Sequence, residues 1–222
     1  MYPINLNMKG RRIVIFGGGR VALRKLRRLL EEGAVVTVVA PEALLEIAQL
    51  KKAGKILWLQ ENHKAYDWDD SKPQLVFAAT DRADINHAIC QLGRRHGAWV
   101  NSATSPDDCD FQVPARIRRG ELELTASTGG GSPAFARLLR HDLEGRYHED
   151  FGSFLEWLRE ARKELRNKEP DTAMRQMLWR NVMNQEIFNL VLNHRLEQAE
   201  DEVRRKIGGA GAESSHSPGR DS

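Results

Sequence analysis

Short runs of apolar, β-branched residues alternate with stretches whose apolar positions recur every three or four residues along the first half of the chain. The first run spans 13–16, and the amphipathic stretch after it places Leu26 and Leu29 on one face. Gly33 follows, as is typical of a helix end, and a second apolar run covers 35–39. The pattern therefore predicts a strand, a helix and a strand in succession.

The same alternation continues to residue 104. It predicts a helix opened by Pro41 over 42–53, a helix capped by Asp81 that runs to about 96, and strands over 56–59, 75–79 and 99–104. Strands that alternate with helices form a parallel sheet wound by right-handed crossovers. Ligands bind beyond the carboxyl ends of such strands, so residues 17–21, 40–42, 80–81 and 101–104 are expected to share one ligand-binding edge.

Beyond residue 104 the pattern changes. Two strands over 111–117 and 121–127 read as a hairpin, Ser132 and Pro133 open a helix to about 143, and helical patterns continue to 207. We predict the α/β class, with a Rossmann-type parallel sheet domain at 1–113, a small hairpin-plus-helix region at 114–146, a helical domain at 147–207 and a disordered tail at 208–222.

Three glycines, Gly17, Gly18 and Gly19, separate the first strand from its helix in the pattern Gly17-x-Gly19-x-x-Ala22. The first glycine permits a tight turn, the second lets a pyrophosphate approach bare backbone, and the small Ala22 lets the helix lie close to the sheet. A plain tight loop is the alternative, but the flanking strand, helix and strand favour a dinucleotide site. We expect the phosphates at the helix N-terminus, where Arg20 and Val21 complete the group of cofactor-binding candidates.

Four further residues of that edge are candidates for cofactor contact. Glu42 lies about twenty residues past the glycines, where an acid can bond ribose hydroxyls and favour NAD over NADP. The alternative for Glu42 is an ordinary acid in the first turn of a helix. Thr80, Asp81 and Pro41 lie at the same edge, although helix capping alone accounts for Asp81.

Composition narrows the function classes. The chain has 222 residues, of which 41% are hydrophobic, and a net charge of only +3, which calls for no nucleic acid. No apolar run approaches the length of a membrane span and no signal peptide is evident, so we expect no membrane association and a cytoplasmic location.

Arginines cluster near Arg116, where they form either a solvated face or a site for an anionic ligand. Cys90 is expected in the core, whereas Cys109 is a reactive or an inert surface thiol. The histidine spacings predict no metal site.

Several separate motifs occur in an order that resembles one family, the precorrin-2 dehydrogenases, including the dehydrogenase and chelatase module of siroheme synthases. The likeness runs from Leu6 to about Leu143. The motifs are Gly17-Gly18-Gly19-Arg20-Val21-Ala22-Leu23-Arg24-Lys25, Phe77-Ala78-Ala79-Thr80-Asp81, Val100-Asn101, Asp110-Phe111-Gln112-Val113-Pro114-Ala115 and Ser127-Thr128-Gly129-Gly130-Gly131-Ser132-Pro133-Ala134.

The resemblance implies NAD-dependent oxidation of precorrin-2 to sirohydrochlorin by a homodimer, in which region 114–146 supplies the subunit contact and part of the active site. Precorrin-2 carries many carboxylates, and a second glycine loop at a helix start could hold them. An ordinary capped helix start is the equal alternative for that loop. The substrate-binding candidates are Arg116, Thr128, Gly129, Gly130 and Ser132.

One position departs from the family pattern. Many members carry an aspartate three residues after the Val-Asn pair, with roles in dehydrogenation and metal insertion, and this chain has Thr104 there. Threonine is neither an anionic base nor a good ligand for a hard metal. Asp107, Asp108 and Asp110 lie just beyond, and the loop could bring one of them into the site. For Asp107 and Asp108 the alternative is a solvated turn residue. The catalytic candidates are therefore Thr104, Asn101, which also suits the cofactor, and Asp107.

We favour the dehydrogenase on these grounds, because hydride transfer needs mainly positioning against the nicotinamide. Two alternatives stay open. One is a bifunctional enzyme that also inserts iron into sirohydrochlorin, and the other is a non-catalytic module that senses NAD.

Overall fold

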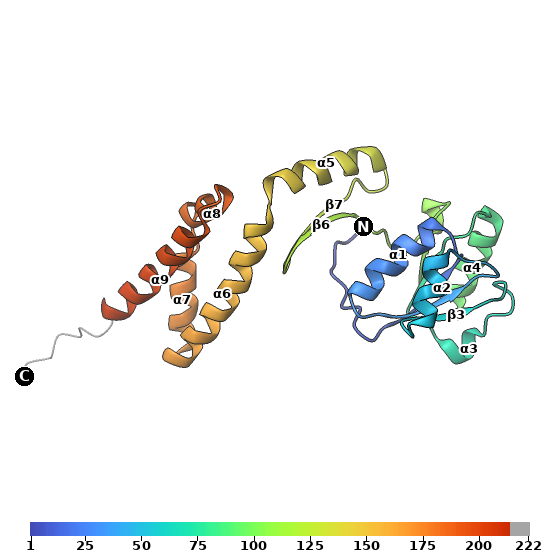
Figure 1. Ribbon diagram of the computed structural model, residues 1–222, viewed down its shortest axis with the longest axis horizontal. Coiled ribbons are helices and arrows are strands. Elements are labelled where there is room, and N and C mark those ends of the chain that lie inside the picture. Colours follow the sequence, from blue (N-terminus) through green and yellow to red (C-terminus); the bar gives the residue numbers. More distant parts are fainter. Residues whose placement is uncertain (214–222) are drawn as a thin grey trace, which may run out of the picture. The chain divides into compact units, whose positions relative to one another are not determined.

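The computed structural model describes residues 1–213 and divides into two compact units, Met1–Val113 and a second unit that begins at Pro114. Figure 1 labels their helices and some of their strands. The first unit contains, in chain order, β1 (Arg12–Phe16), α1 (Arg20–Glu31), β2 (Val35–Val39), α2 (Leu45–Lys52), β3 (Leu57–Leu59), α3 (Trp68–Ser71), β4 (Leu75–Ala78), α4 (Ala83–Arg95), β5 (Trp99–Ser102) and the short 3₁₀ helix η1 (Pro106–Asp108).

The five strands of the first unit form one parallel sheet in the order β3-β2-β1-β4-β5, which confirms the predicted fold class. Alternate side chains of β1 enter two different cores. Ile13 and Ile15 pack with Leu26 of α1, whereas Val14 and Phe16 pack with residues of α4 on the other face. The sheet is therefore buried on both sides, as parallel sheets require.

Two helices of the first unit begin later than predicted. The amide of Leu44 donates to the carbonyl of Gly18 at 3.0 Å, and α2 starts only at Leu45, so Pro41 does not open the helix. This bond holds the segment after β2 against the glycine turn in a non-helical path. Similarly, α4 starts at Ala83 with Arg82 as its N-cap, so the prediction that Asp81 caps it is wrong.

The second unit opens with the antiparallel hairpin of β6 (Ala115–Arg119) and β7 (Leu122–Ala126). The predicted first strand began too early, because Phe111 still belongs to the first unit, where its ring lies 5.4 Å from that of Phe77. The hairpin contacts α5 (Pro133–Arg146), and the Ser132 hydroxyl accepts a bond from the amide of Phe135 at 3.2 Å. The predicted cap of this helix is thus confirmed.

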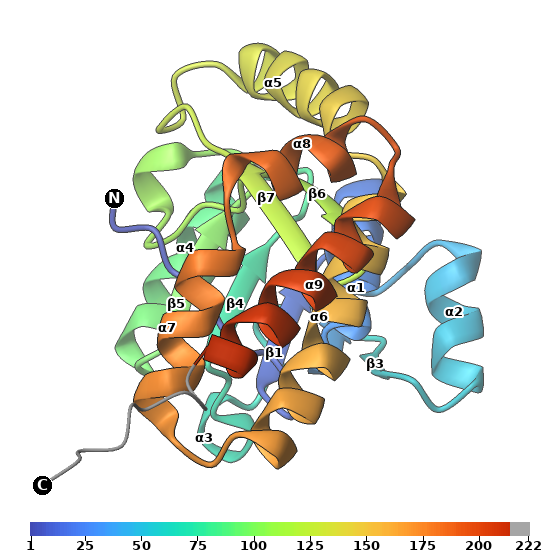
Figure 2. The same ribbon diagram turned by 90° about the vertical axis from the view of Figure 1, so that its left-hand side faces the viewer.

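Four helices complete the second unit: α6 (Glu149–Lys168), α7 (Thr172–Val182), α8 (Gln185–Leu192) and α9 (Leu196–Glu213). Figure 2 shows α6, α7 and α9 side by side, and their shared core includes Phe154, Val182 and Val203. Helix α9 continues past the boundary predicted at residue 207, and the rest of the predicted tail, 214–222, lies outside the described residues. No helix within residues 1–213 is both long enough and apolar enough to span a bilayer.

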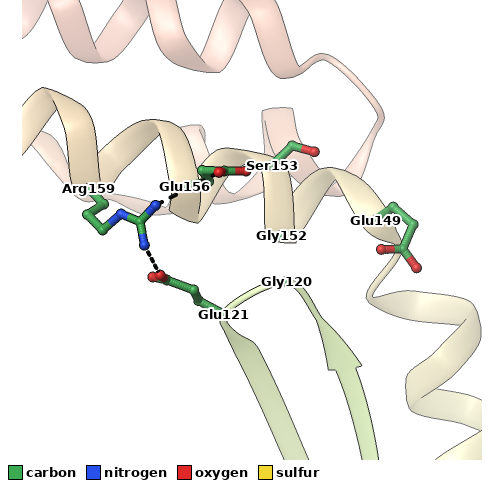
Figure 3. Close-up of a pocket in the computed structure, with 7 residues that line it drawn as sticks. All are labelled: Gly120, Glu121, Glu149, Gly152, Ser153, Glu156 and Arg159. Atoms are coloured by element: carbon green, nitrogen blue, oxygen red, sulfur yellow. Dashed lines mark hydrogen bonds and ion pairs between the residues drawn. The ribbon is translucent and has the colours of Figure 1, made fainter. Parts of the chain in front are cut away.

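The hairpin turn packs directly on α6 (Figure 3). A Cβ on Gly152 would lie 2.6 Å from the carbonyl oxygen of Arg119, so only a glycine allows the two backbones to come this close. The guanidinium of Arg119 donates to the carbonyl of Tyr147 at 3.0 Å, and an ion pair joins Arg159 to Glu121. The hairpin is thereby fixed to the start of the helical part of its own unit.

We therefore expect two helical glycines to respond in opposite directions to alanine. Gly152→Ala should lower the free energy of unfolding by about 1–3 kcal/mol, because the new methyl group meets backbone that cannot rotate away. Gly145→Ala in α5 meets nothing within 4 Å and should raise it by up to ~1 kcal/mol through helix propensity. Urea denaturation followed by circular dichroism measures both. Equal effects of the two substitutions would contradict the close packing.

Candidate functional site

The first turn after β1 lies against the end of β4. Gly17 has φ of 119°, and a Cβ there would lie 2.3 Å from the carbonyl oxygen of Ala79. Its amide donates to the carbonyl of Val39 at 2.9 Å, so the turn is also bonded to the end of β2. Only glycine tolerates both this positive φ and the lack of room for a Cβ. The carboxyl ends of three neighbouring strands thus converge at the point where the strand order reverses, which is where open α/β sheets bind their ligands.

The next two glycines differ in what surrounds them. A Cβ on Gly18 would lie 2.1 Å from the carbonyl oxygen of Glu42, so this residue allows the segment after β2 to pack against the turn. A Cβ on Gly19 would meet nothing within 4 Å, and its φ of −88° is open to any residue. Glycine at this position is therefore not explained by packing. It leaves the backbone bare toward open space, as a closely approaching ligand requires.

The start of α1 suits an anion. Gly19 is its N-cap and supplies no side-chain bond, and the first turn contains no acidic residue. The positive end of the helix dipole therefore faces outward without compensation from a carboxylate. Arg20 and Val21 are exposed here, whereas Ala22 is fully buried against the sheet. These residues fit the diphosphate of a dinucleotide.

Glu42 and Pro41 are exposed and lie beside the glycine turn. Since α2 begins at Leu45, the alternative of Glu42 as a first-turn helix acid is wrong. Its position next to Gly18 supports a contact with the ribose next to the diphosphate, although the assignment itself stays a prediction.

A buried amide connects the ends of β4 and β5. Asn86 of α4 is fully buried, and its Oδ1 accepts bonds from the amide and the hydroxyl of Thr80 at 3.0 and 2.7 Å. Its Nδ2 donates to the carbonyl of Thr80 at 3.1 Å and to Oγ1 of Thr104 at 3.2 Å. All four bonding positions of the amide are used. The structure thus brings Thr80 and Thr104 together through a residue that sequence reasoning missed, while Asp81 lies exposed next to them.

A second missed residue is Lys25 of α1. Its ammonium group donates to Oδ1 of Asn101 at 2.8 Å and lies 4.7 Å from the centre of the Phe77 ring. Asn101 is buried and its Nδ2 donates to the carbonyl of Phe111 at 2.9 Å, so both ends of this amide are fixed. Burial, helped by the nearby charge of Arg24, lowers the pKa of Lys25 from 10.5 to about 8.

The sequence does carry a signal for Lys25. It lies three residues after Ala22 and one before Leu26, on the apolar stripe of the helix, where a charged residue is unexpected. A strongly shifted pKa at the carboxyl edge of a parallel sheet is typical of functional groups, and also of structural pairs.

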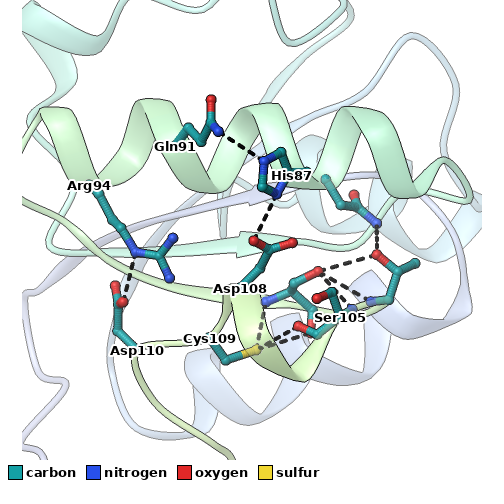
Figure 4. Close-up of polar contacts among 10 residues, drawn as sticks. His87, Gln91, Arg94, Ser105, Asp108, Cys109 and Asp110 are labelled. Atoms are coloured by element: carbon teal, nitrogen blue, oxygen red, sulfur yellow. Dashed lines mark hydrogen bonds and ion pairs between the residues drawn. The ribbon is translucent and has the colours of Figure 1, made fainter.

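The loop after β5 is fastened to α4 (Figure 4). Asp108 accepts a bond from Nδ1 of His87 at 2.8 Å, and Asp110 binds Arg94 at 2.8 Å and the amide of Val100 at 2.9 Å. Asp108 is thereby occupied by a structural contact, whereas Asp107 at the start of η1 is exposed.

Cys109 in this loop is half-buried, and its thiol is hydrogen-bonded within the loop. Its Sγ accepts a bond from the amide of Ser102 at 3.2 Å and donates toward the carbonyl of Ser105 at 3.4 Å. Cys90 is buried in the core, as predicted, and burial raises its pKa to about 12.

The predicted substrate-binding residues lie in the second unit. Arg116 is mostly buried and forms an ion pair with Glu123 across the hairpin at 3.6 Å. The hydroxyl of Thr128 accepts a bond from the amide of Ser132 at 3.1 Å, so the second glycine loop closes on itself before α5. Gly129 and Gly130 are exposed at its tip. The capped helix start is therefore present, and a role of these five residues in substrate binding stays a prediction.

Known proteins resemble the chain in both sequence and fold. A family described as putative NAD(P)-binding matches residues 4–115. The siroheme synthase of Methylococcus capsulatus is 37% identical over 199 residues, which cover 89% of this chain and 41% of that protein. The siroheme synthase of Azotobacter vinelandii is 33% identical, with coverage of 94% and 44%. The chain thus spans less than half the length of these relatives.

A solved structure, that of the precorrin-2 dehydrogenase SirC, superposes with a TM-score of 0.72 at 25% sequence identity. The match covers 92% of this chain and all of the SirC chain. The likeness therefore extends through the sheet unit into the second unit.

The buried ammonium group of Lys25 predicts how the free energy of unfolding changes with pH. The unfolded chain keeps the ordinary pKa of 10.5, so between pH 8 and 10.5 it binds more protons than the folded chain does. As the pH rises, Lys25 loses its proton in the folded chain, and the free-energy cost of burying a charged ammonium group disappears. The free energy of unfolding of the wild type, relative to Lys25→Met, should increase by up to ~1.4 kcal/mol per pH unit over this range. Urea denaturation from pH 7 to 10 measures it, and a constant difference would contradict the burial.

Proposed function

This chain belongs to the putative NAD(P)-binding family, and on that basis we propose that it is an NAD-dependent dehydrogenase that oxidises precorrin-2 to sirohydrochlorin in siroheme biosynthesis. The observation that carries the proposal is the bare glycine turn at the strand-order reversal, in a fold that superposes on a precorrin-2 dehydrogenase over the whole of its chain. A dinucleotide site alone would leave the substrate open, and the likeness to SirC supports precorrin-2.

In this proposal the cofactor lies along the carboxyl edge of the sheet. Residues 17–21 hold the diphosphate, Glu42 bonds the adenosine ribose hydroxyls, and Thr80 and Asp81 flank the cofactor where β4 ends. An acid at the ribose favours NAD over NADP, because it would repel a 2′-phosphate. When bound, NAD supplies the nicotinamide ring that accepts the hydride, and the chain supplies orientation.

Polar groups at the end of β5 are proposed to serve the substrate. Asn101 and Thr104 are held in place by Lys25 and Asn86, so their amide and hydroxyl are pre-organised. Lys25, with its pKa lowered to about 8, can hold or release a proton at Nζ near neutral pH. Asp107 adds an exposed carboxylate in the same loop, where a proton can be accepted. Thr104 carries no negative charge, so we do not propose iron insertion.

The substrate carboxylates are assigned to the second unit. Arg116 offers a guanidinium, and Thr128, Gly129, Gly130 and Ser132 offer backbone and hydroxyl donors near the start of α5. These groups suit an anionic tetrapyrrole, and the exposed loop tip leaves the backbone amides of Gly129 and Gly130 accessible.

We also propose that the protein is a cytoplasmic homodimer. Helix α5 has no buried residue, and it exposes Phe135 and Leu138 to 55% and 65%. Large apolar side chains exposed together on one helix are typical of an interaction surface. A second copy of region 114–146 would cover them.

Anaerobic incubation with precorrin-2 and NAD tests the function. We expect NADH and the absorption spectrum of sirohydrochlorin to appear together. In Gly19→Asp, binding of NAD should be lost, because the carboxylate would occupy the place of the diphosphate. Aspartate is a favoured helix N-cap, so this variant should fold at least as well as the wild type. The matched Gly19→Asn, which adds the same bulk without charge, should bind NAD more tightly than Gly19→Asp does.

Two outcomes would contradict the proposal. NAD binding without any NADH formation would favour the sensing module, and unchanged NAD affinity in Gly19→Asp would remove the cofactor site. Ferrous or cobaltous ion added to the same reaction tests iron insertion, for which we expect no rate above that of the protein-free control.

The proposed dimer predicts a change of mass on substitution in α5. Phe135→Glu combined with Leu138→Glu should convert the dimer to a monomer in sedimentation equilibrium, because charges would enter the apolar contact. Both side chains are exposed in the single chain, so the circular dichroism spectrum should not change. A wild type that is monomeric at micromolar concentration would contradict the proposal.

A further inference from the structure

Two histidines and an aspartate meet in the second unit, far along the chain from the glycine turn. His148 is the N-cap of α6 and Asp150 lies in the first turn of that helix. His194 lies 44 residues beyond Asp150, in the turn between α8 and α9. One ligand atom from each of the three residues lies within 4.8 Å of the other two.

The turn that carries His194 holds its ring in place. His194 has φ of 58°, its amide donates to the carbonyl of Val191 at 3.1 Å, and the amide of Arg195 donates to the carbonyl of Leu190 at 2.9 Å. This is the Schellman pattern of a helix end, whose left-handed residue is usually glycine or asparagine. A histidine here is tolerated, and its ring stacks on that of His148 with 3.7 Å between centroids.

The bonding of His148 fixes which nitrogen is free. Its Nε2 lies 3.3 Å from the carbonyl oxygen of Leu192, and because a carbonyl only accepts, Nε2 carries the hydrogen. In the neutral ring, Nδ1 therefore carries the lone pair. Histidines that bind metals make this same bond, with one nitrogen on a backbone carbonyl and the other on the ion.

The free nitrogen of His148 is buried beside the carboxylate of Asp150. Nδ1 of His148 is the one buried side-chain nitrogen or oxygen without a hydrogen-bond partner among the described residues. It lies 3.5 Å from Oδ2 of Asp150, which itself accepts a hydrogen bond from Nδ1 of His194 at 3.0 Å. A lone pair on nitrogen and a carboxylate oxygen repel each other across this gap. A cation between the three atoms would remove this repulsion, with the hydrogen of His194 on Nε2 so that its Nδ1 is free to bind the ion.

We propose that His148, Asp150 and His194 form a binding site for a divalent transition-metal ion. Two imidazole nitrogens and one carboxylate oxygen are ligands that Zn²⁺, Co²⁺ and Fe²⁺ accept, whereas Mg²⁺ and Ca²⁺ prefer oxygen alone. Three protein ligands leave at least one coordination position open. The ion would tie the start of α6 to the turn between α8 and α9, and the site is independent of the proposed dehydrogenase function.

Cobalt provides a direct test, because Co²⁺ bound to imidazole and carboxylate absorbs visible light in a way that reports its ligands. The full chain without a polyhistidine tag is titrated with Co²⁺, and equilibrium dialysis measures stoichiometry and affinity. We expect one ion per chain, with a ligand-field spectrum of nitrogen and oxygen coordination. Zn²⁺ should displace the Co²⁺ and raise the melting temperature.

Three variants separate this site from adventitious binding. His194→Asn keeps a residue that favours the left-handed turn, and Asp150→Asn keeps the shape of the side chain. Each removes a direct ligand, so each should weaken Co²⁺ binding at least as much as loss of an outer-shell partner does, about 10–100-fold. His141→Asn, at an exposed histidine of α5, is the control and should bind Co²⁺ like the wild type.

The opposite results would overturn the proposal. One such result is that the wild type binds no stoichiometric Co²⁺. Another is that His194→Asn and Asp150→Asn leave the Co²⁺ affinity unchanged. A third is that His141→Asn loses as much Co²⁺ affinity as they do. A lower melting temperature in the two ligand variants, with no response of the wild type to Zn²⁺, would identify the three residues as a helix-capping network instead.

Discussion

The contact between Gly17 and the carbonyl of Ala79 determines the geometry of the first unit. A Cβ would lie 2.3 Å from that oxygen, so the ends of β1 and β4 can converge only because the side chain is a hydrogen atom. The strand order reverses between β1 and β4, and open α/β sheets bind their ligands at such a reversal. Every other residue of the candidate nucleotide site is placed relative to this contact.

The side-chain amides of Asn86 and Asn101 hold the other polar groups at the carboxyl edge of the sheet in place. Asn86 bonds Thr80 to Thr104, and Asn101 bonds Lys25 to the segment that ends the first unit. Both amides are buried and bonded at both ends, so each removes freedom from the groups it contacts. The site therefore consists of bare backbone on one side and fixed polar side chains on the other, which suits chemistry that depends on positioning.

Local patterns in the sequence predict the structural features that depend only on residues close together in the chain. The strands, the glycine turn and the cap at Ser132 follow from periodicity and residue type within a few positions. The start of α2 could not be predicted, because it depends on the bond between Leu44 and Gly18 across two elements. For the same reason the partners of Lys25 and Asn86 were missed. His148 and His194 showed no metal-binding spacing, because a helix end far along the chain brings them together.

Nuclear magnetic resonance of the isotope-labelled chain, recorded during titration with NAD, tests the central claim most directly. The largest changes in backbone amide chemical shift should occur at residues 17–22, since bare backbone at the start of α1 is proposed to hold the diphosphate. Smaller shifts should follow at Glu42 and Thr80, beside the same turn. Shifts that leave residues 17–22 unchanged and concentrate elsewhere would contradict the account.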